Sequence, residues 1–480
     1  MNSNINTKIK TSDNFKSWCY SDKNRPLLRC LTCGSVDDGK STLIGRLLHD
    51  TQQIYVDQLN VLKNDSKRYG TQDKDTIDLA LLVDGLQDER EQGITIDVAY
   101  RYFSTNQRKF IIADTPGHEQ YTRNMVTGAS TCDLSILLVD ARKGLSKQTY
   151  RHTFISSLLG IKYFIVAINK MDLVEYKKDI YLNIKKQFLI FSEKISHNLK
   201  IFFVPISSLL GDNIVFPSSF MAWYDGITLL RILETIDIHH HTNIEEIRFP
   251  VQYINRPNAN FRGYSGTLVS GKMLVGQKIK ILPANISSRI ARIVTFEKDL
   301  KIAYSGQAIT VVLEDDIDIS RGDFLVNVNS DLIAHKKAVI DVVWMTDTTL
   351  LVGQEYMIKL SGKKTRVYIE KILYTIDINT LKKIKSNKLS LNNIGRIQII
   401  FNIPMIFDSY QDNRFTGNII LIDLLTNNTV GAGMIVESIN EKIIKKEPDM
   451  KQFELDLRSL ICQYFPHWSI NIDNINKGCK

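Results

Sequence analysis

An apolar strand pattern that runs directly into a glycine-rich loop constrains this chain more than any other feature. Residues 27–32 are mostly apolar, and the segment from Gly34 to Ser41 fits GxxxxGK[ST]. The apolar periodicity over 41–48 then predicts a helix. A strand, this loop and a helix, in that order, form a phosphate-binding loop in which backbone N–H groups and the helix N-terminus face an anion. The sequence therefore predicts a nucleoside triphosphate site, without indicating the base.

The pattern around this loop predicts an α/β domain followed by two β-barrels. Short apolar runs alternate with helix-like stretches such as 148–159, which is typical of a mostly parallel sheet with helices on both faces. After about residue 245, short alternating segments such as 266–269 and 278–282 are separated by turn residues and predict an all-β barrel. The region 336–437 predicts a second barrel. The α/β strands are expected at 27–32, 109–113, 134–139, 163–168 and 201–206.

The length of 480 residues indicates roughly three domains. The expected organisation is an N-terminal tail over 1–24, the P-loop domain over 25–240, barrels over 245–335 and 336–440, and a tail over 441–480 that is partly helical at 453–465. The polar start has no apolar segment typical of a signal peptide, and no apolar run is long enough to cross a bilayer. We therefore expect a cytoplasmic protein without a membrane partner.

Charge and cysteine usage predict little about function. The net charge of +9 comes mostly from isolated basic pairs, so it does not by itself predict nucleic-acid binding. Cys30-x-x-Cys33 has the spacing of a redox pair or half a metal site, but no second pair completes a zinc pattern, and a buried strand is the favoured interpretation. His239 to His241 lie in a polar stretch and are interpreted as part of a linker.

The strand pattern at 109–113 ends in Asp114-Thr115-Pro116-Gly117-His118. Ligands of an open parallel sheet bind at the carboxyl ends of its strands. We therefore expect Asp114 to hold Mg²⁺ through a water molecule, and the Ser41 hydroxyl to bind the ion directly. The Gly117 N–H is expected to face a γ-phosphate. The pattern DxxG is common in turns, but its place at the end of an apolar strand favours this interpretation.

Two further strand patterns end where a base would lie. The run 163–168 ends in Asn169-Lys170-Met171-Asp172. A carboxylate placed edge-on to guanine accepts from both N1–H and the exocyclic amine, a donor pair that adenine lacks, so Asp172 predicts guanine. The Lys170 stem is expected to lie along the ring, and Asn169 to brace the loop. The run 201–206 ends at Ser207, in a segment where a backbone N–H is expected to meet the guanine oxygen.

Thr95, within Gly93-Ile94-Thr95-Ile96, is the candidate switch residue. Its hydroxyl is expected to complete the Mg²⁺ shell and to respond to the γ-phosphate. The alternative is an ordinary β-branched residue of a strand. The expected metal ligands are thus Ser41, Thr95 and, through water, Asp114, and the expected cofactors are GTP and Mg²⁺.

These ordered motifs resemble the translation-factor class of GTPases. Within that class the chain is most similar to the family of large, GTPase subunits of bacterial sulfate adenylyltransferase (ATP sulfurylase). Elongation factor Tu and its relatives usually place histidine where Ser35 and Asp38 stand here. The stretches that carry the resemblance are 31–50, 84–103, 114–130, 141–149, 261–272, 313–323, 429–437 and 465–469.

The resemblance implies a GTPase that drives the reaction of a small catalytic subunit. That subunit joins sulfate to ATP and gives adenosine 5′-phosphosulfate and diphosphate. His118 is implied to orient the attacking water, beside an apolar gate of Val36 and Ile94. A neutral histidine would position this water rather than remove a proton fully, since charge builds mainly on the phosphoryl oxygens. The alternatives are a hydrogen-bonding role at a helix start for His118, and loop stabilisation for Asp37 and Asp38.

The predicted catalytic residues are His118, Lys40 and Thr95, with Lys40 neutralising β/γ-phosphate charge. The predicted contacts to GTP are Gly34, Ser35, Val36, Asp37, Asp38, Gly39, Lys40, Ser41, Asp114, Thr115, Pro116, Gly117, His118, Asn169, Lys170, Met171, Asp172 and Ser207.

Two other functions remain open from the sequence. A translation-type GTPase acting on tRNA or the ribosome shares the motifs, the barrels and the positive charge. A degraded GTPase kept as a binding scaffold is less consistent, because every nucleotide motif is intact. The expected partner is the small catalytic subunit, and no nucleic-acid partner is expected.

Overall fold

The computed structural model describes residues 25–54, 57, 62, 77–83, 87–92, 94–196, 198–238, 246–258, 261–378 and 380–439. Three predicted segments lie outside these residues: the tail over 1–24, the linker histidines His239 to His241, and the tail over 441–480 with its helix at 453–465.

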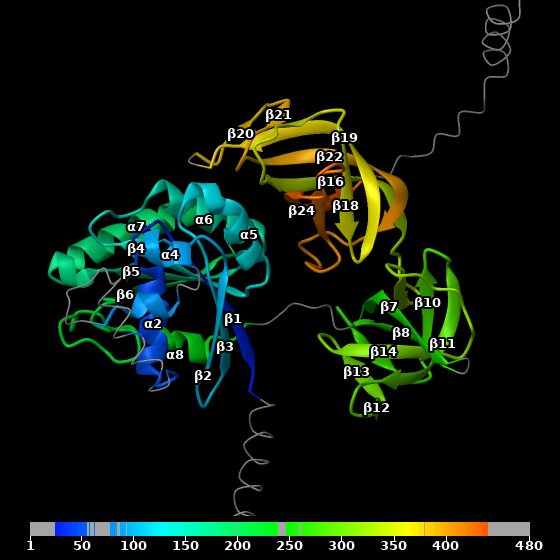
Figure 1. The fold of residues 1–480 in the computed structure, drawn as a ribbon, viewed down its shortest axis with the longest axis horizontal. Helices are drawn as coiled ribbons and strands as arrows, with labels where there is room; N and C mark the ends of the chain where they lie inside the picture. Colours follow the sequence, from blue (N-terminus) through cyan, green and yellow to red (C-terminus); the bar gives the residue numbers. More distant parts are fainter. Residues whose placement is uncertain are drawn as a thin grey trace, which may run out of the picture. The chain divides into compact units, whose positions relative to one another are not determined.

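The N-terminal part contains a six-stranded sheet in the order β2-β3-β1-β4-β5-β6 (Figure 1). All neighbours are parallel except β2, which runs antiparallel to β3. The predicted mostly parallel sheet is therefore confirmed. The strands are β1 (Leu27–Cys33), β2 (Ala99–Ser104), β3 (Lys109–Asp114), β4 (Leu134–Asp140), β5 (Tyr163–Asn169) and β6 (Lys200–Pro205).

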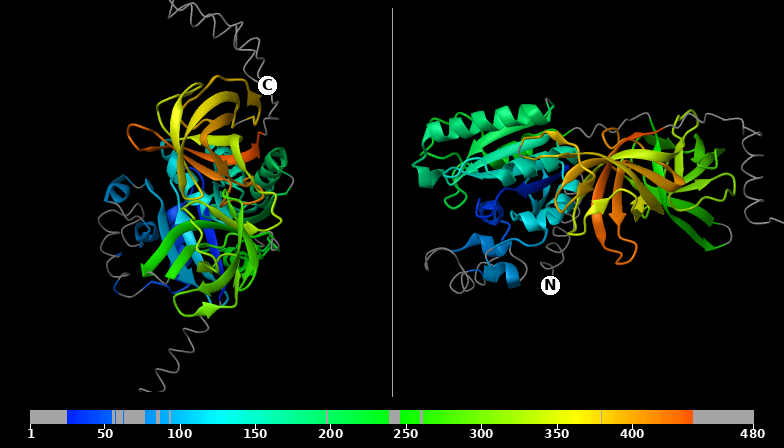
Figure 2. Two further views of the ribbon diagram at one scale, coloured as in Figure 1. Left: turned by 90° about the vertical axis from the view of Figure 1, so that its right-hand side faces the viewer. Right: turned by 90° about the horizontal axis from the view of Figure 1, so that it is seen from above.

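Helices cover both faces of this sheet, as the views of Figure 2 show. Helices α2 and α6 coincide with the expected helices at 41–48 and 148–159, with small shifts of their ends. The α-helices are α2 (Lys40–Asp50), α4 (Gln87–Gln92), α5 (Thr122–Ser130), α6 (Lys147–Leu158), α7 (Lys178–Ile195) and α8 (Leu229–Thr235). The 3-10 turns are η1 (Leu79–Leu82), η2 (Glu119–Tyr121) and η3 (Met171–Val174).

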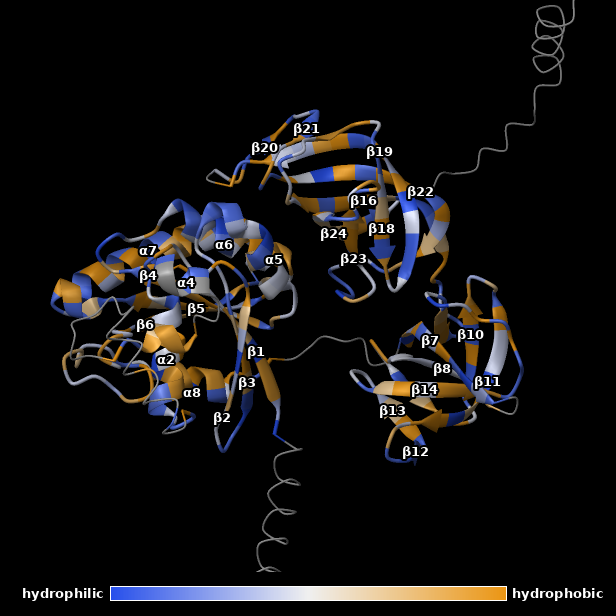
Figure 3. Cartoon of the chain, in the orientation of Figure 1, coloured by the Kyte–Doolittle hydropathy of each residue, from blue (hydrophilic) through white to orange (hydrophobic). Residues whose placement is uncertain are grey.

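The apolar strands feed two cores, because successive side chains of a strand point to opposite faces. On β4, Leu137 and Val139 join the core formed with α5, α6 and α7. Leu134, Ile136 and Leu138 join the core formed with α2 and α8. Figure 3 shows β1 and β5 mostly in the hydrophobic colour. Burial on both faces explains why these strands are continuous apolar runs rather than alternating ones.

The first barrel is an antiparallel seven-stranded sheet in the order β10-β15-β7-β8-β14-β11-β12, closed by pairing of β10 with β11. The predicted strand at 278–282 is confirmed as β10, but the strand expected at 266–269 ends earlier, at Thr267. Leu268 and Val269 are buried yet leave the ladder, because their N–H groups donate to Gln307 and Arg248 at the barrel end. The strands are β7 (Arg248–Asn258), β8 (Phe261–Thr267), β9 (Lys272–Leu274), β10 (Lys278–Leu282), β11 (Ile286–Val294), β12 (Asp299–Leu300), β13 (Ile302–Tyr304), β14 (Ala308–Leu313) and β15 (Phe324–Asn327).

The second barrel is antiparallel in the order β18-β23-β24-β16-β22-β19-β20 and is closed by pairing of β18 with β19. Its interior holds Trp344, whose ring meets Tyr356 edge-on at 5.5 Å and whose Nε1–H donates to the Thr348 carbonyl at 2.6 Å. The strands are β16 (Ala334–Trp344), β17 (Leu350–Leu351), β18 (Glu355–Leu360), β19 (Lys363–Ile376), β20 (Lys383–Ile384), β21 (Lys388–Leu389), β22 (Ile394–Ile406), β23 (Asn418–Ile422) and β24 (Thr429–Ser438).

The Cys30 and Cys33 thiols are free and fully buried on β1, so the strand interpretation of this pair is confirmed. Burial raises the pKa of the Cys33 thiol to about 12, which keeps it protonated and unreactive. Within the described ranges, no group of three or more His, Cys, Asp or Glu side chains is arranged to hold a metal ion. No helix in the described part of the chain is long and apolar enough to span a membrane.

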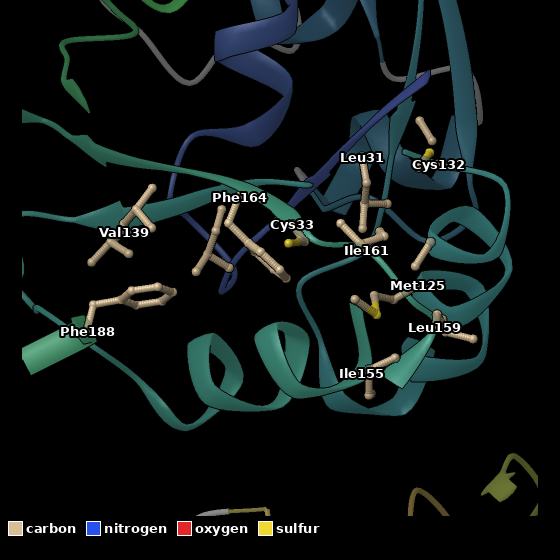
Figure 4. Packing of buried hydrophobic residues seen from close by; sticks show 14 of the residues in the cluster. Leu31, Cys33, Met125, Cys132, Val139, Ile155, Leu159, Ile161, Phe164 and Phe188 are labelled. Carbon is tan, nitrogen blue, oxygen red and sulfur yellow. The ribbon is translucent and has the colours of Figure 1, made fainter. Parts of the chain in front are cut away.

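Phe164 on β5 offers a test of the packing shown in Figure 4. Its ring is fully buried in the core formed with α5, α6 and α7. We expect Phe164→Ala to lower the free energy of unfolding by about 3–5 kcal/mol, since it removes a large apolar side chain and leaves a cavity. Leu182→Ala, on the exposed side of α7, is the matched control and should cost less than about 1 kcal/mol. Urea unfolding measures both, and equal losses would contradict the core assignment.

Candidate functional site

The phosphate loop connects β1 to α2 and lies against the end of β5. Gly39 has φ 92°, and a Cβ built there would lie 2.4 Å from Nδ2 of Asn169. A side chain at Gly39 would therefore be strained and would also displace Asn169. The local conformation thus explains the glycine immediately before Lys40.

Side chains of the loop fix its own backbone. The Ser35 N–H donates to the Asp38 carboxylate at 2.6 Å, and Nζ of Lys40 donates to the Ser35 carbonyl at 2.7 Å. Burial raises the pKa of Asp38, and Lys40 opposes that rise. The Ser35 hydroxyl lies 2.6 Å from that of Ser146, the N-cap of α6. These contacts support the loop-stabilising interpretation of Asp38.

Three oxygen groups meet beside the loop. The Ser41 hydroxyl donates to the Asp114 carboxylate at 2.9 Å and lies 3.4 Å from Oγ1 of Thr95. Thr32 donates to the other Asp114 oxygen at 2.9 Å. Thr95 precedes β2, so the alternative of an ordinary strand residue is wrong. Three hard oxygen groups in contact match the ligand preference of Mg²⁺.

The segment after β3 lies close against the phosphate loop. A Cβ built on Gly117 would lie 2.6 Å from the Val36 nitrogen and 2.7 Å from Nζ of Lys40. Thr115 is buried and donates to the Thr32 carbonyl at 2.7 Å, and Pro116 is buried beside it. Only glycine therefore permits this approach of the two backbones.

His118 is exposed and forms the N-cap of η2. Its Nδ1 accepts a hydrogen bond from the Gln120 N–H at 3.3 Å. This contact matches the hydrogen-bonding role at a helix start. It places the proton of a neutral ring on Nε2, which leaves that nitrogen for a further contact.

Asn169 joins three loops at the predicted base end. Its Nδ2 donates to the Asp38 carbonyl at 2.7 Å, and its Oδ1 accepts from the Ser208 N–H at 2.9 Å. One buried amide thus uses its donor on the phosphate loop and its acceptor on the segment after β6.

Lys170 has a left-handed backbone with φ 63°. Its Nζ donates to the Asp37 carbonyl at 2.5 Å and lies 3.2 Å from the Asp140 carboxylate. Met171 is buried behind it, and Asp172 is partly exposed. The lysine stem is therefore fixed at both the phosphate loop and the end of β4.

The segment after β6 uses its first N–H groups within the chain. Ser207 is buried and its N–H donates to the Asp212 carbonyl at 3.3 Å, while that of Ser208 binds Asn169. The Arg46 guanidinium of α2 donates to the carbonyls of Ser208 and Leu209. The predicted contact of Ser207 with guanine stays a prediction.

The sequence interpretation missed Asp140 at the end of β4. Arg142 donates to its two oxygens at 3.1 and 2.7 Å. Burial raises the pKa of Asp140, but the hydrogen bonds from Arg142 and the contact with Lys170 outweigh it and lower the pKa to about 2. Its position after an apolar strand is the signal that, in retrospect, points to a role at this edge.

His152 of α6 was also missed, and no sequence pattern singles it out. The side chain is buried, and its Nδ1 accepts from the Gly34 N–H at 3.2 Å. Burial, helped by the charges of Lys40 and Arg151, lowers the pKa of His152 to about 3. A neutral imidazole therefore accepts the hydrogen bond from the first residue of the phosphate loop.

Comparisons with known proteins match this architecture. Residues 25–242 match the family model Elongation factor Tu GTP binding domain, and residues 337–436 match GTP-eEF1A C-terminal domain-like. Sulfate adenylyltransferase subunit 1 of Buchnera aphidicola is 68% identical over 97% of this chain and 98% of its own length. That of Erwinia tasmaniensis is 56% identical over 98% of each chain. The crystal structure of Sup35 complexed with GDP aligns with a TM-score of 0.40 at 19% identity, covering 87% of this chain and 95% of its own.

The low pKa of His152 gives a pH prediction. The folded chain keeps this side chain neutral, whereas the unfolded chain takes up a proton below about pH 6.5. The free energy of unfolding therefore decreases as the pH falls from about 6.5 toward 3. The decrease is about 2 kcal/mol between pH 6.5 and pH 5. His152→Gln keeps an acceptor for Gly34 but removes the titration, so urea unfolding should show a loss smaller by about 2 kcal/mol over this interval.

The control is Ser157→Ala on the same helix, a change that adds and removes no titratable group. It should leave the pH dependence of unfolding as in the wild type. A His152→Gln variant with the wild-type dependence would contradict the buried neutral state of His152.

Proposed function

Because the chain belongs to the family of sulfate adenylyltransferase subunit 1, we propose that it is the GTPase subunit of such an enzyme. In this proposal GTP hydrolysis drives transfer of the adenylyl group of ATP to sulfate, giving adenosine 5′-phosphosulfate and diphosphate. The observation that carries the proposal is similarity along nearly the whole chain, which extends beyond the nucleotide motifs that all GTPases of this class share.

The proposed organisation is a GTP-binding domain over 25–240 and barrels over 245–335 and 336–440. The relatives bear the name subunit 1, which indicates a further subunit in their enzyme. For this chain we propose the small catalytic subunit as partner, within the cytoplasm. The small subunit would then hold ATP and sulfate while this chain holds GTP.

The geometry supports GTP as the ligand of the P-loop domain. Loop N–H groups and Lys40 would bind the phosphates, while Asp172 would accept from N1–H and the exocyclic amine of guanine. The contacts of Asn169 and Lys170 with the carbonyls of the phosphate loop support this assignment, since they join the base end to the phosphate end.

Mg²⁺ fits the oxygen cluster beside the loop. Ser41 and Thr95 would bind the ion directly and Asp114 through water, and their contacts already bring the three groups together. When bound, the ion would neutralise charge on the β- and γ-phosphates. The burial of Asp114 supports this role, because a buried carboxylate gains from a nearby cation.

His118 would orient the water that attacks the γ-phosphate. With Nδ1 occupied by the Gln120 N–H, Nε2 is the nitrogen available for this contact. The Gly117 N–H would face the γ-phosphate, which is supported by the close approach of Gly117 to Val36 and Lys40. Positioning and charge stabilisation suffice here, since phosphoryl transfer needs little proton removal in the transition state.

The test is to purify the chain with the small subunit and to measure formation of adenosine 5′-phosphosulfate from ATP and sulfate. GTP should raise the product yield, and Lys40→Ala should remove this stimulation while the chain stays folded. A wild-type pair without GTP stimulation would reject the proposal. Hydrolysis stimulated by ribosomes, or tRNA binding with a steep salt dependence, would instead favour the translation-type function.

Base selection gives a separate prediction. Asp172→Asn replaces two acceptors at the base edge by one acceptor and one donor, which suits xanthine rather than guanine. We expect GTP affinity to fall by at least about a hundredfold, and xanthosine triphosphate to bind better than GTP. Calorimetric titration measures both affinities. The exposed Asp225→Asn is the matched control and should keep the wild-type preference. Unchanged GTP affinity in Asp172→Asn would remove this residue from base recognition.

A further inference from the structure

A buried glutamate outside the nucleotide motifs binds the backbone next to Thr95. We propose that Glu89, together with Asn124, is a positioning residue that holds Thr95 in the geometry for Mg²⁺ and the γ-phosphate. The inference rests on the proposed GTP function and deepens it, because it names what makes the site prefer a triphosphate over a diphosphate.

Glu89 lies on α4 and only 3% of its surface is exposed. Its Oε1 accepts from the Ile96 N–H at 2.9 Å and from the Asp97 N–H at 3.2 Å. Both donors directly follow Thr95 in the chain. One charged oxygen thus fixes the two peptide groups that follow Thr95, whose hydroxyl lies in the oxygen cluster.

Asn124 of α5 binds the same segment at a backbone carbonyl rather than at an N–H group. Its Nδ2 donates to the Ile96 carbonyl at 2.7 Å. The Ile96 residue therefore has its N–H bound by Glu89 and its carbonyl bound by Asn124. Because side chains bind both the N–H and the carbonyl of Ile96, the backbone at this residue has little freedom to rotate.

The consequence appears at Thr95. Its Oγ1 lies 3.4 Å from Oγ of Ser41, which in turn donates to Asp114. The position of the Thr95 hydroxyl within this cluster depends on the backbone that Glu89 and Asn124 fix. A buried carboxylate is costly unless its charge is hydrogen-bonded, so these two N–H groups offset part of the cost of burying Glu89.

The expected effect depends on the nucleotide. Thr95 is proposed to contact the ion and the γ-phosphate, and GDP offers no γ-phosphate. Loosening the segment should therefore weaken GTP binding much more than GDP binding. A residue that only stabilises the fold would weaken both nucleotides alike, so the ratio of the two affinities separates a positioning role from a structural one.

The experiment is calorimetric titration of the full chain with GTP and with GDP, each with Mg²⁺. Glu89→Ala should lower the GTP affinity by about tenfold and leave the GDP affinity within about twofold. Asn124→Ala should act in the same direction. It leaves Glu89 unchanged and therefore provides the test if Glu89→Ala fails to fold. Asp88→Ala, at the exposed neighbour on α4, is the matched control and should bind both nucleotides as the wild type does.

Coupling to Thr95 gives the decisive arm. If Glu89 acts through Thr95, then Thr95→Ala should show the same selective loss, and the double variant should lose little more than either single one. Additive losses, or equal losses for GTP and GDP, would overturn the inference while GTP binding itself stands. A wild-type chain that binds neither nucleotide would overturn the proposed function and this inference together.

Discussion

The candidate site depends on the two hydrogen bonds that the side-chain amide of Asn169 makes. This amide binds the Asp38 carbonyl of the phosphate loop with its donor and the Ser208 N–H with its acceptor. A phosphate loop offers its N–H groups to a ligand only if its carbonyls are turned away and held elsewhere. Asn169, Lys170 and Lys40 each hold one such carbonyl, at Asp38, Asp37 and Ser35. The carbonyls of the loop are therefore held by side chains from two parts of the chain, the loop's own Lys40 and the pair at the end of β5.

The fold followed from patterns that are local in sequence. Continuous apolar runs marked strands buried on both faces, and β4 and β5 are covered by helices on each side. The ends of β3 and β5 carry the DxxG and NKxD motifs, and strand ends of a parallel sheet meet at one edge. That rule is enough to predict that Asp114 and Asn169 lie near the phosphate loop.

The supporting residues were not predictable in the same way. His152 lies inside helix α6, whose sequence has no marked pattern, and only the fold brings its ring to the N–H of Gly34. Glu89 belongs to a charged stretch that is typical of a solvated surface, yet its side chain is buried and two backbone N–H groups donate to its carboxylate. Both cases depend on contacts between elements, for which a single sequence gives no local signal.

The closure of both barrels bears on how this chain behaves at high concentration. Pairing of β10 with β11 and of β18 with β19 leaves, in the part of the chain that the structure describes, only the two-residue strands β12 and β20 at the margins of these sheets. A margin so short offers a second molecule almost no row of open peptide groups to extend. The two barrels are thereby protected against the strand pairing between molecules that leads to fibrils.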